Sequence, residues 1–300
     1  PPVRTILDRE RFDVIDIHEP LCSTLTLTIL NLSKAINVGT FHACHRKPRG
    51  YQIVSPFMMG LFKKLHGKIA VSEPAKEFVS KYFPGEYQVI PNGINVARFS
   101  TPRPLIEGLS DGKLNILFVG RPEKRKGLTY LLEAYRKVKR QVPLSRLIVV
   151  GPGTERYDSE ARKLGLEDAV FTGYVDNDML PSYYQSADIF CSPATGGESF
   201  GIILLEAMAA SKPIVASAIS GYASVMSDGV QGILVPPKDK EALAGALIKL
   251  LSDPDLRQQM GAKGRIRAEE CDWPNVADRV NQYYVSLIEP KRAVQGASPR

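Results

Sequence analysis

Short runs of β-branched and other apolar residues alternate with amphipathic helical stretches along the whole chain. Two parallel strands need a long crossover connection, which is usually a helix, so this alternation is typical of parallel sheets covered by helices on both faces. A polar, proline-containing stretch at 100–113 separates a shorter first series from a longer and more regular second one. The sequence therefore predicts an α/β protein with two domains.

The first series is the less complete of the two. We expect helices near 25–35, 56–66 and 74–82. They separate strands that we expect at 14–18, 38–42, 68–72 and 88–90. A complete sheet of this type has about five to seven strands, and no glycine-rich loop precedes the first run. We therefore expect this domain to lack its first strands.

The second series contains the six strands of a Rossmann-like unit. We expect them at 115–119, 146–150, 170–172, 189–192, 214–216 and 233–235. A last helical stretch at 275–288 follows Trp273-Pro274 and has no obvious partner in that sheet. We predict a partial first domain at 1–105, a second Rossmann-like domain at 106–272, and a helix at 273–300 that crosses back to the first domain.

Composition excludes several classes of protein. Apolar runs such as 202–205 are far shorter than the roughly 20 residues of a membrane-spanning helix, so we expect neither such a helix nor a secretory leader. The four cysteines have no paired spacing, so we expect free thiols and neither a zinc site nor a disulfide framework. We expect a cytoplasmic location.

Positive charge is concentrated in one segment. The net charge is +7, and residues 20–72 contain no Asp or Glu. The cations of this segment are Lys34, Arg46, Lys47, Arg49, Lys63, Lys64 and Lys68. No recognition helix or aromatic-interleaved platform accompanies them, so we expect no nucleic-acid partner. The stretch 56–65 has an apolar face edged with lysines, which either covers a sheet or lies on an anionic membrane.

Two carboxylates eight positions apart carry the clearest chemical signal. Glu198 lies in a turn with Gly196, Gly197 and Ser199, which predicts a helix start whose free N–H groups and dipole favour an anion such as phosphate. Glu206 lies in an apolar helical run and needs a hydroxyl or a cation as partner. A helical rise of about 1.5 Å per residue would separate the carboxylates by roughly 10 Å, the length of a diphosphate with a sugar at either end. The spacing suggests a nucleotide sugar.

A second anion-binding loop is predicted at 120–127, directly after the strand at 115–119. Ligands of open α/β sheets bind at the carboxyl ends of parallel strands. Arg121 offers a planar fork for phosphate oxygens, and Lys126 offers a point charge. The turns at 151–153 and 173–176 also follow strands, but either turn can be a simple chain reversal.

These motifs resemble those of the retaining glycosyltransferases of family 4, which have the GT-B fold of two Rossmann-like domains facing a cleft. The resemblance rests on Glu-x7-Glu at 198–206, Gly-Arg-x4-Lys-Gly at 120–127 and Pro-Asn-Gly-Ile at 91–94. Within the family the chain looks most like the phosphatidylinositol mannosyltransferases, through Asp-Ile-His-Glu-Pro at 16–20, Thr-Phe-His at 40–42 and the stretch 195–202.

The resemblance implies GDP-mannose as donor and assigns a role to individual residues. Catalytic roles fall on His42, which faces the transferred sugar, and on Arg121, Lys126 and Glu198. Arg121, Arg125 and Lys126 are the donor-binding cations, and Lys47 lies on the acceptor side. The remaining donor contacts are Val175 near the base, Glu198, Ser199, Phe200, Gly201 and Ile202 on the sugar and phosphate, and Glu206 on the ribose.

The resemblance also implies a hexosyltransferase that retains anomeric configuration by front-side attack, with no cofactor. Because cations and a helix N-terminus can neutralise the leaving diphosphate, we expect no metal and assign no Asp-x-Asp pair to the site. The implied acceptor is a phosphatidylinositol-type lipid or glycolipid at the inner face of the cell membrane, where the protein associates peripherally with the anionic surface.

Two departures from the family pattern leave alternatives open. The family's amino-terminal glycine-rich loop is absent, and Asn95 stands where the family often has Asp. The alternatives are a family 4 transferase that uses a UDP-sugar and another acceptor, a catalytically inactive nucleotide-sugar-binding protein, and a sugar-nucleotide epimerase.

Overall fold

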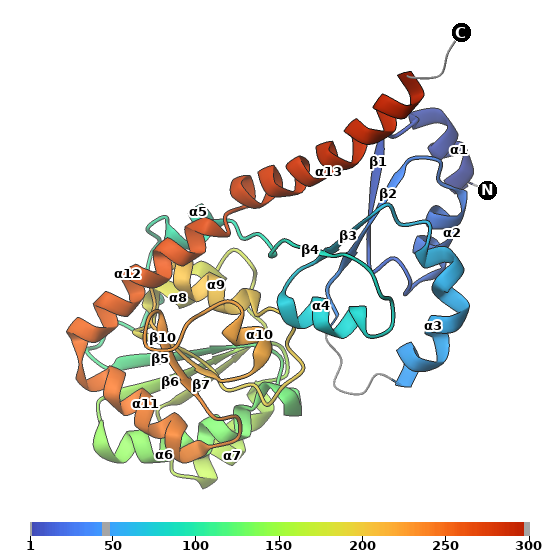
Figure 1. Cartoon of the computed structure of the whole chain (residues 1–300). Helices are drawn as coiled ribbons and strands as arrows, with labels where there is room; N and C mark the ends of the chain where they lie inside the picture. The colour runs from blue at the N-terminus through green and yellow to red at the C-terminus, as the bar shows by residue number, and fades with distance from the viewer. Residues whose placement is uncertain (1, 44–48, 297–300) are drawn as a thin grey trace. The chain divides into compact units, whose positions relative to one another are not determined.

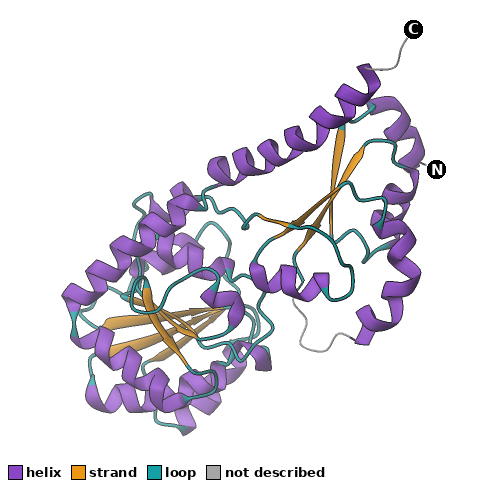
Figure 2. Ribbon diagram, in the orientation of Figure 1, coloured by secondary structure: helices purple, strands orange, loops and turns teal. Residues whose placement is uncertain are grey.

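The computed structural model describes residues 2–43 and 49–296, and it divides into two compact units (Figure 1). The first unit comprises residues 1–92 and 274–300, and the second runs from Gly93 to Trp273. Each unit is built on one parallel sheet (Figure 2). None of the helices in the described part of the chain is both long enough and apolar enough to cross a membrane.

The first unit has a four-stranded sheet in the order β1-β2-β3-β4. Its strands are β1 (Val14–His18), β2 (Ile36–Phe41), β3 (Gly67–Ala70) and β4 (Gln88–Val89). Its helices are α1 (Pro2–Glu10), which the sequence analysis did not predict, α2 (Thr24–Leu32), α3 (Arg49–Phe62), α4 (Glu73–Ser80) and most of α13 (Trp273–Gly296).

Helix α13 covers one face of this sheet. Val276 is buried with Ile36, Val38 and Ile69, and the partly buried side chains of Val280, Tyr283, Tyr284, Leu287 and Ile288 pack around them. The hydroxyl of Tyr284 donates a hydrogen bond of 2.7 Å to Asp16 on β1. The last helix is therefore a structural layer of the first unit, although the chain reaches it only after completing the second.

The second unit has a six-stranded sheet in the order β10-β9-β8-β5-β6-β7. Its strands are β5 (Leu114–Val119), β6 (Ser145–Val150), β7 (Ala169–Gly173), β8 (Ile189–Ser192), β9 (Ile214–Ser217) and β10 (Gly232–Val235). The α-helices are α5 (Val96–Ser100), α6 (Leu128–Gln141), α7 (Asp158–Lys163), α8 (Leu180–Ser186), α9 (Ile202–Ala209), α10 (Ser220–Ala223), α11 (Lys240–Ser252) and α12 (Pro254–Glu270).

The second unit begins earlier than the predicted boundary at 105/106. Helix α5 belongs to it because Val96 and Phe99 are buried and the Phe99 ring meets Tyr184 of α8 edge to face, with centroids 5.4 Å apart. Ile94 also pairs with Asp272 in an isolated bridge. The polar stretch at 100–113 thus follows the change of unit, because apolar side chains before it already pack on the second core.

Candidate functional site

The loop after β5 is held close to the loop after β8 by the backbone. In the sheet order β8 and β5 are neighbours although far apart in sequence, which makes the gap between them a topological switch point where α/β sheets bind ligands. Gly127 has φ +74°, and a Cβ there would lie 2.0 Å from the carbonyl oxygen of Pro193. The Thr195 N–H donates to the Arg125 carbonyl at 2.7 Å. The two predicted anion-binding loops therefore form one structure.

Glu198 and two cations meet in this structure. The Lys126 Nζ lies 2.8 Å from Glu198 Oε1, and both side chains are largely buried, at 15% and 13% exposed. Arg125 also forms an ion pair with Glu198, and its Nε donates to Glu123 at 2.7 Å. The short 3-10 helix η1 (Lys124–Lys126) delivers both cations to the same carboxylate. We call Arg125, Lys126 and Glu198 the ionic cluster.

Arg121 does not join the ionic cluster. Its side chain is exposed, and within residues 2–43 and 49–296 no hydrogen bond or ion pair of its guanidinium is found. The predicted contact of Arg121 with the donor diphosphate stays a prediction. Arg125, which the sequence analysis also assigns to the donor, is the cation that accompanies Lys126 at Glu198. The reason is the 3-10 turn, which directs neighbouring residues toward Glu198 whereas Arg121 lies before it.

The glycines around Glu198 allow backbone conformations that other residues rarely adopt. Gly196, Gly197 and Gly201 have φ of +137°, +78° and +97°, and α9 begins directly after Gly201. Ser199, Phe200 and Ile202 lie within this turn or at the helix start, as predicted. Gly201 has no side chain to cap the first turn of α9, which leaves that helix end suited to an anion. Because residues 198–201 are not helical, the helical estimate of the distance from Glu198 to Glu206 does not apply.

Gly221 and Tyr222, which the sequence analysis did not identify, pack against this turn. A Cβ on Gly221 would lie 2.0 Å from the Glu198 carbonyl oxygen, so α10 approaches the turn as closely as a backbone can. Tyr222 is fully buried, and its hydroxyl lies 2.7 Å from the Ser192 hydroxyl at the end of β8. Gly221 lies in the segment that follows β9, at the carboxyl end of a strand of the same sheet, and this position is the signal that could have identified it.

Glu206 has the hydroxyl partner that its apolar surroundings require. The Tyr184 hydroxyl of α8 donates a hydrogen bond of 2.7 Å to Glu206 Oε2. Burial raises the pKa of Glu206, while the Tyr184 hydrogen bond and the charge of Arg98 oppose that rise. Nothing in the sequence pattern pointed to Tyr184 or Arg98. A partly desolvated carboxylate of this kind is ready to accept hydrogen bonds from ligand hydroxyls.

Val175 lies in the loop after β7, beside an acidic pair that sequence reasoning overlooked. Asp176 and Asp178 have Asp-x-Asp spacing, and both are exposed. The Tyr174 hydroxyl donates to Asp176 at 3.3 Å. Across the described ranges 2–43 and 49–296, no group of three or more His, Cys, Asp or Glu side chains could hold a metal ion.

In the first unit, the predicted sugar-facing residue His42 follows β2. Glu19 Oε1 accepts hydrogen bonds from the backbone N–H groups of His42 and Ala43, each 2.7 Å long. The His18 Nδ1 lies 2.7 Å from the His42 Nε2. Desolvation lowers the pKa of His42, as does the charge of His18. The predicted acceptor-side Lys47 lies outside the described residues.

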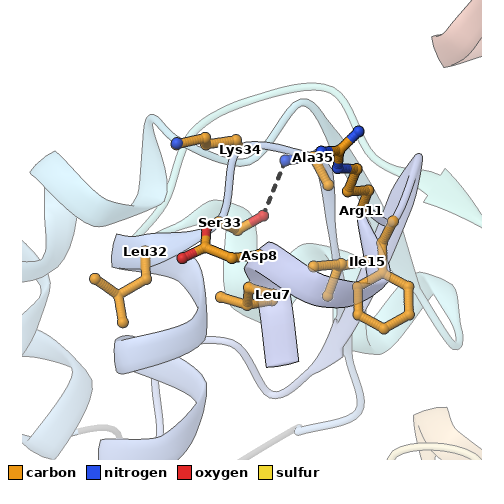
Figure 3. Close-up of a pocket in the computed structure, with 9 residues that line it drawn as sticks. Leu7, Asp8, Arg11, Ile15, Leu32, Ser33, Lys34 and Ala35 are labelled. Carbon is orange, nitrogen blue, oxygen red and sulfur yellow. Dashed lines mark hydrogen bonds between the residues drawn. The ribbon is translucent and has the colours of Figure 1, made fainter. Parts of the chain in front are cut away.

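A cavity of about 400 Å³ opens at the other end of the first sheet (Figure 3). It lies where α1 meets the turn after α2, next to Asp8, Arg11 and Lys34, and the Ala35 N–H donates to the Ser33 hydroxyl at 3.2 Å on its wall. This turn precedes β2, so the cavity is at the amino ends of the strands. Since ligands of such sheets bind at the carboxyl ends, the candidate site is not in this cavity.

Comparison with known proteins agrees with the two-unit architecture. Residues 105–267 match the family described as glycosyl transferases group 1, and residues 1–98 match glycosyltransferase family 4. The chain is 36% identical over 292 residues to the phosphatidyl-myo-inositol mannosyltransferase of Mycolicibacterium smegmatis, which covers 96% of this chain and 75% of that protein. It is 30% identical over 286 residues to the protein of the same name from Propionibacterium freudenreichii, covering 94% and 72%.

Solved structures share the fold. A glycosyltransferase from Rickettsia africae superposes with a TM-score of 0.81 at 19% identity, covering 96% of this chain and 80% of that one. Sucrose-phosphate synthase from Thermosynechococcus elongatus gives 0.78 at 22% identity, covering 96% and 76%. The chain therefore belongs to the family 4 glycosyltransferases and has the GT-B fold, which confirms the predicted fold class.

Proposed function

We propose that this glycosyltransferase transfers mannose from GDP-mannose to a phosphatidylinositol-type lipid at the inner surface of the cell membrane. The observation that carries the proposal is the 36% identity, over 96% of the chain, to a relative named phosphatidyl-myo-inositol mannosyltransferase. Identity of that extent includes both units, so it bears on the donor and the acceptor sides alike.

The ionic cluster supports a donor with a diphosphate. Arg125 and Lys126 share the Glu198 carboxylate, and a diphosphate offers them the same kind of oxygen with more negative charge. When the cations turn to phosphate, Glu198 is free to accept hydrogen bonds from sugar hydroxyls. Glu206, held by Tyr184, is assigned to the ribose of the same donor.

Transfer proceeds in this proposal by front-side attack. The acceptor hydroxyl oxygen bonds to the anomeric carbon on the face from which the diphosphate leaves, and the bond from that carbon to the phosphate oxygen breaks. The acceptor proton passes to the departing phosphate oxygen. Configuration is retained because the new bond forms on the face from which the diphosphate leaves. Arg125, Lys126 and the exposed Arg121 stabilise the charge that develops on the leaving group, which removes the need for a metal.

An amphipathic surface on the first unit supports the membrane acceptor. Phe57 on α3 is 81% exposed, although a phenyl ring gains by burial. Lys63 and Lys64 follow the end of the same helix and are exposed, within the segment that contains no Asp or Glu. Apolar and basic side chains in this arrangement suit an anionic lipid surface.

A second acceptor class is favoured by another relative. The D-inositol 3-phosphate glycosyltransferase of Kineococcus radiotolerans is 34% identical over 244 residues, covering 72% of this chain and 55% of that protein. Its name specifies a water-soluble inositol phosphate. The two candidates share inositol chemistry and differ in the lipid.

The test combines donors and acceptors with the purified chain. GDP-mannose and UDP-glucose are each offered with phosphatidylinositol vesicles or with inositol 3-phosphate, and products are identified by mass spectrometry. We expect a mannosyl lipid with an α linkage by NMR, formed equally in the presence of EDTA. Transfer from UDP-glucose alone, or to the soluble phosphate alone, would replace the proposal with the alternative. Hydrolysis or epimerisation without transfer would refute it.

A further inference from the structure

One sequence motif that the donor site does not use lies beside His42. It is Asp-Ile-His-Glu-Pro at 16–20, at the end of β1. Strands β1 and β2 are parallel neighbours in which His18 is opposite Thr40. The residues that follow both strands therefore emerge at the same edge of the sheet.

Glu19 fixes the backbone of His42. Its own φ is +49°, a conformation that costs a non-glycine residue about 1 kcal/mol. Its N–H donates to the Thr40 carbonyl at 2.8 Å, and its carboxylate accepts from the N–H groups of both His42 and Ala43. A residue held in a strained conformation by three hydrogen bonds that all reach the same neighbouring segment is consistent with a positioning role.

His18 fixes the ring of His42. The two rings lie with centroids 5.0 Å apart and planes inclined by 20°, and the separation of 2.7 Å between Nδ1 and Nε2 has room for one hydrogen only. One imidazole must donate and the other accept, so the tautomer of each ring determines that of the other.

We propose that His18 is a positioning residue that sets the orientation and tautomer of His42, with Glu19 holding the backbone, so that a neutral His42 presents its remaining ring edge to the transferred sugar. This inference rests on the proposed function for the role of His42. Because Nε2 is paired with His18, a neutral His42 has one ring nitrogen left, and the tautomer decides whether that nitrogen donates or accepts. A sugar hydroxyl can be its partner in either case.

The charges around His42 act in opposite directions. Desolvation and the charge of His18 lower the pKa of His42, whereas Glu19, Asp16 and Asn92 raise it, and the result is a lowered pKa. Loss of the His18 charge therefore raises the pKa of His42. The acid limb of the pH profile of kcat/KM should then move to higher pH.

The kinetic test compares three variants for mannosyl transfer to phosphatidylinositol. His18→Leu removes the hydrogen bond, and we expect kcat to fall by about 10- to 100-fold with KM for GDP-mannose nearly unchanged, since only orientation is lost. His18→Asn keeps a nitrogen donor near the Nδ1 position, and we expect it to recover kcat to within about 3-fold of the unmodified chain.

His66→Asn is the matched control. His66 lies at the amino end of β3, and its Nδ1 accepts from the Asn37 N–H at 3.0 Å, a bond that an Asn oxygen can replace. We expect unchanged kcat. Full kcat in His18→Leu, or a loss in His66→Asn as large as in His18→Leu, would overturn the proposal.

An NMR titration of the imidazole C2–H signals tests the pairing without any substrate. In His18→Asn the pKa of His42 should rise, and in His66→Asn it should stay at its original value. An unchanged His42 titration in His18→Asn refutes the pairing even if transfer is lost. If the unmodified chain transfers no mannose while the titrations remain coupled, the proposed function fails and the pairing stands.

Discussion

The two units hold polar groups at the carboxyl ends of their strands by different interactions. In the second unit, full charges neutralise one another in the ionic cluster, and glycine backbone packed to within contact distance holds them. In the first unit, two imidazoles share a hydrogen bond and one carboxylate holds the backbone beneath them. The first arrangement suits a ligand part with strong charge, and the second suits hydroxyl groups.

The difference also indicates which kind of substitution should disrupt each site. The ionic cluster depends on backbone packing, because Gly127 and Gly221 have no room for a Cβ. The imidazole pair depends on hydrogen bonds that the side chains of His18, Glu19 and His42 form. Substitutions that displace the backbone should therefore disrupt the ionic cluster, whereas substitutions that change the tautomer of an imidazole should disrupt the imidazole pair.

The largest effect is expected from removing a charge of the ionic cluster. Lys126→Ala and Glu198→Ala should each lower kcat of sugar transfer by about 100- to 1,000-fold, because one preorganised electrostatic contact to a transition state has that value. Circular dichroism should show an unchanged fold. Lys124→Ala, an exposed lysine of the same 3-10 helix, is the control and should keep full activity. Full activity in either cluster variant would remove the assigned role.

Backbone packing is tested by Gly221→Ala. The added Cβ meets the Glu198 carbonyl oxygen, so we expect a loss of about 2 kcal/mol in the free energy of unfolding and a weaker affinity for GDP. In Gly245→Ala on α11 the Cβ has nothing within 4 Å, and the helix should gain about 0.5 to 1 kcal/mol. Denaturant unfolding measures both. Equal stability of the two variants would contradict the claim that the ionic cluster depends on close backbone packing at Gly221.

Glu206→Gln should weaken donor binding and stabilise the folded chain. The amide keeps a hydrogen bond with Tyr184 but removes a desolvated charge, so KM for the donor should rise about 10-fold while the folded chain gains about 1 kcal/mol at neutral pH. Because burial raises the pKa of Glu206, its contribution to stability is present below the unfolded pKa of about 4 and is lost as pH rises through the folded value.

The gain in melting temperature of Glu206→Gln over the unmodified chain should therefore grow between pH 4 and pH 7. A gain that shrinks over this range would contradict the assigned cause. Such a result would mean that the charged form of Glu206 stabilises the folded chain, as expected for an ion-paired carboxylate.

The smallest effect concerns the surface of the first unit. Phe57→Ser should lower partitioning to vesicles that contain phosphatidylinositol by about 3- to 10-fold, through loss of apolar area. Leu144→Ser, which changes a side chain of 66% exposure in the second unit, should have no effect. Cosedimentation at two salt concentrations measures both. Equal binding to neutral and anionic vesicles would contradict an electrostatic contribution.

Much of the fold could be predicted because local periodicity encodes it. All ten strands of the two sheets lie within a few residues of their predicted positions, since buried parallel strands appear as short β-branched runs between helical ones. Helix α1 and the exact start of the second unit could not be predicted, because packing of Phe99 against Tyr184 decides the latter.

Of the candidate site, the sequence alone determined which loops carry charge and glycine, and that Glu206 needs a hydroxyl partner. Only the tertiary structure decided that Arg125 rather than Arg121 joins Lys126 at Glu198, that Tyr184 is the partner, and that His18 meets His42. The physical reason is the distance along the chain over which each kind of signal acts. Turn and helix signals act between near neighbours in the chain, whereas the meeting of side chains from different strands depends on the order of the sheet and on backbone approach that no local pattern specifies.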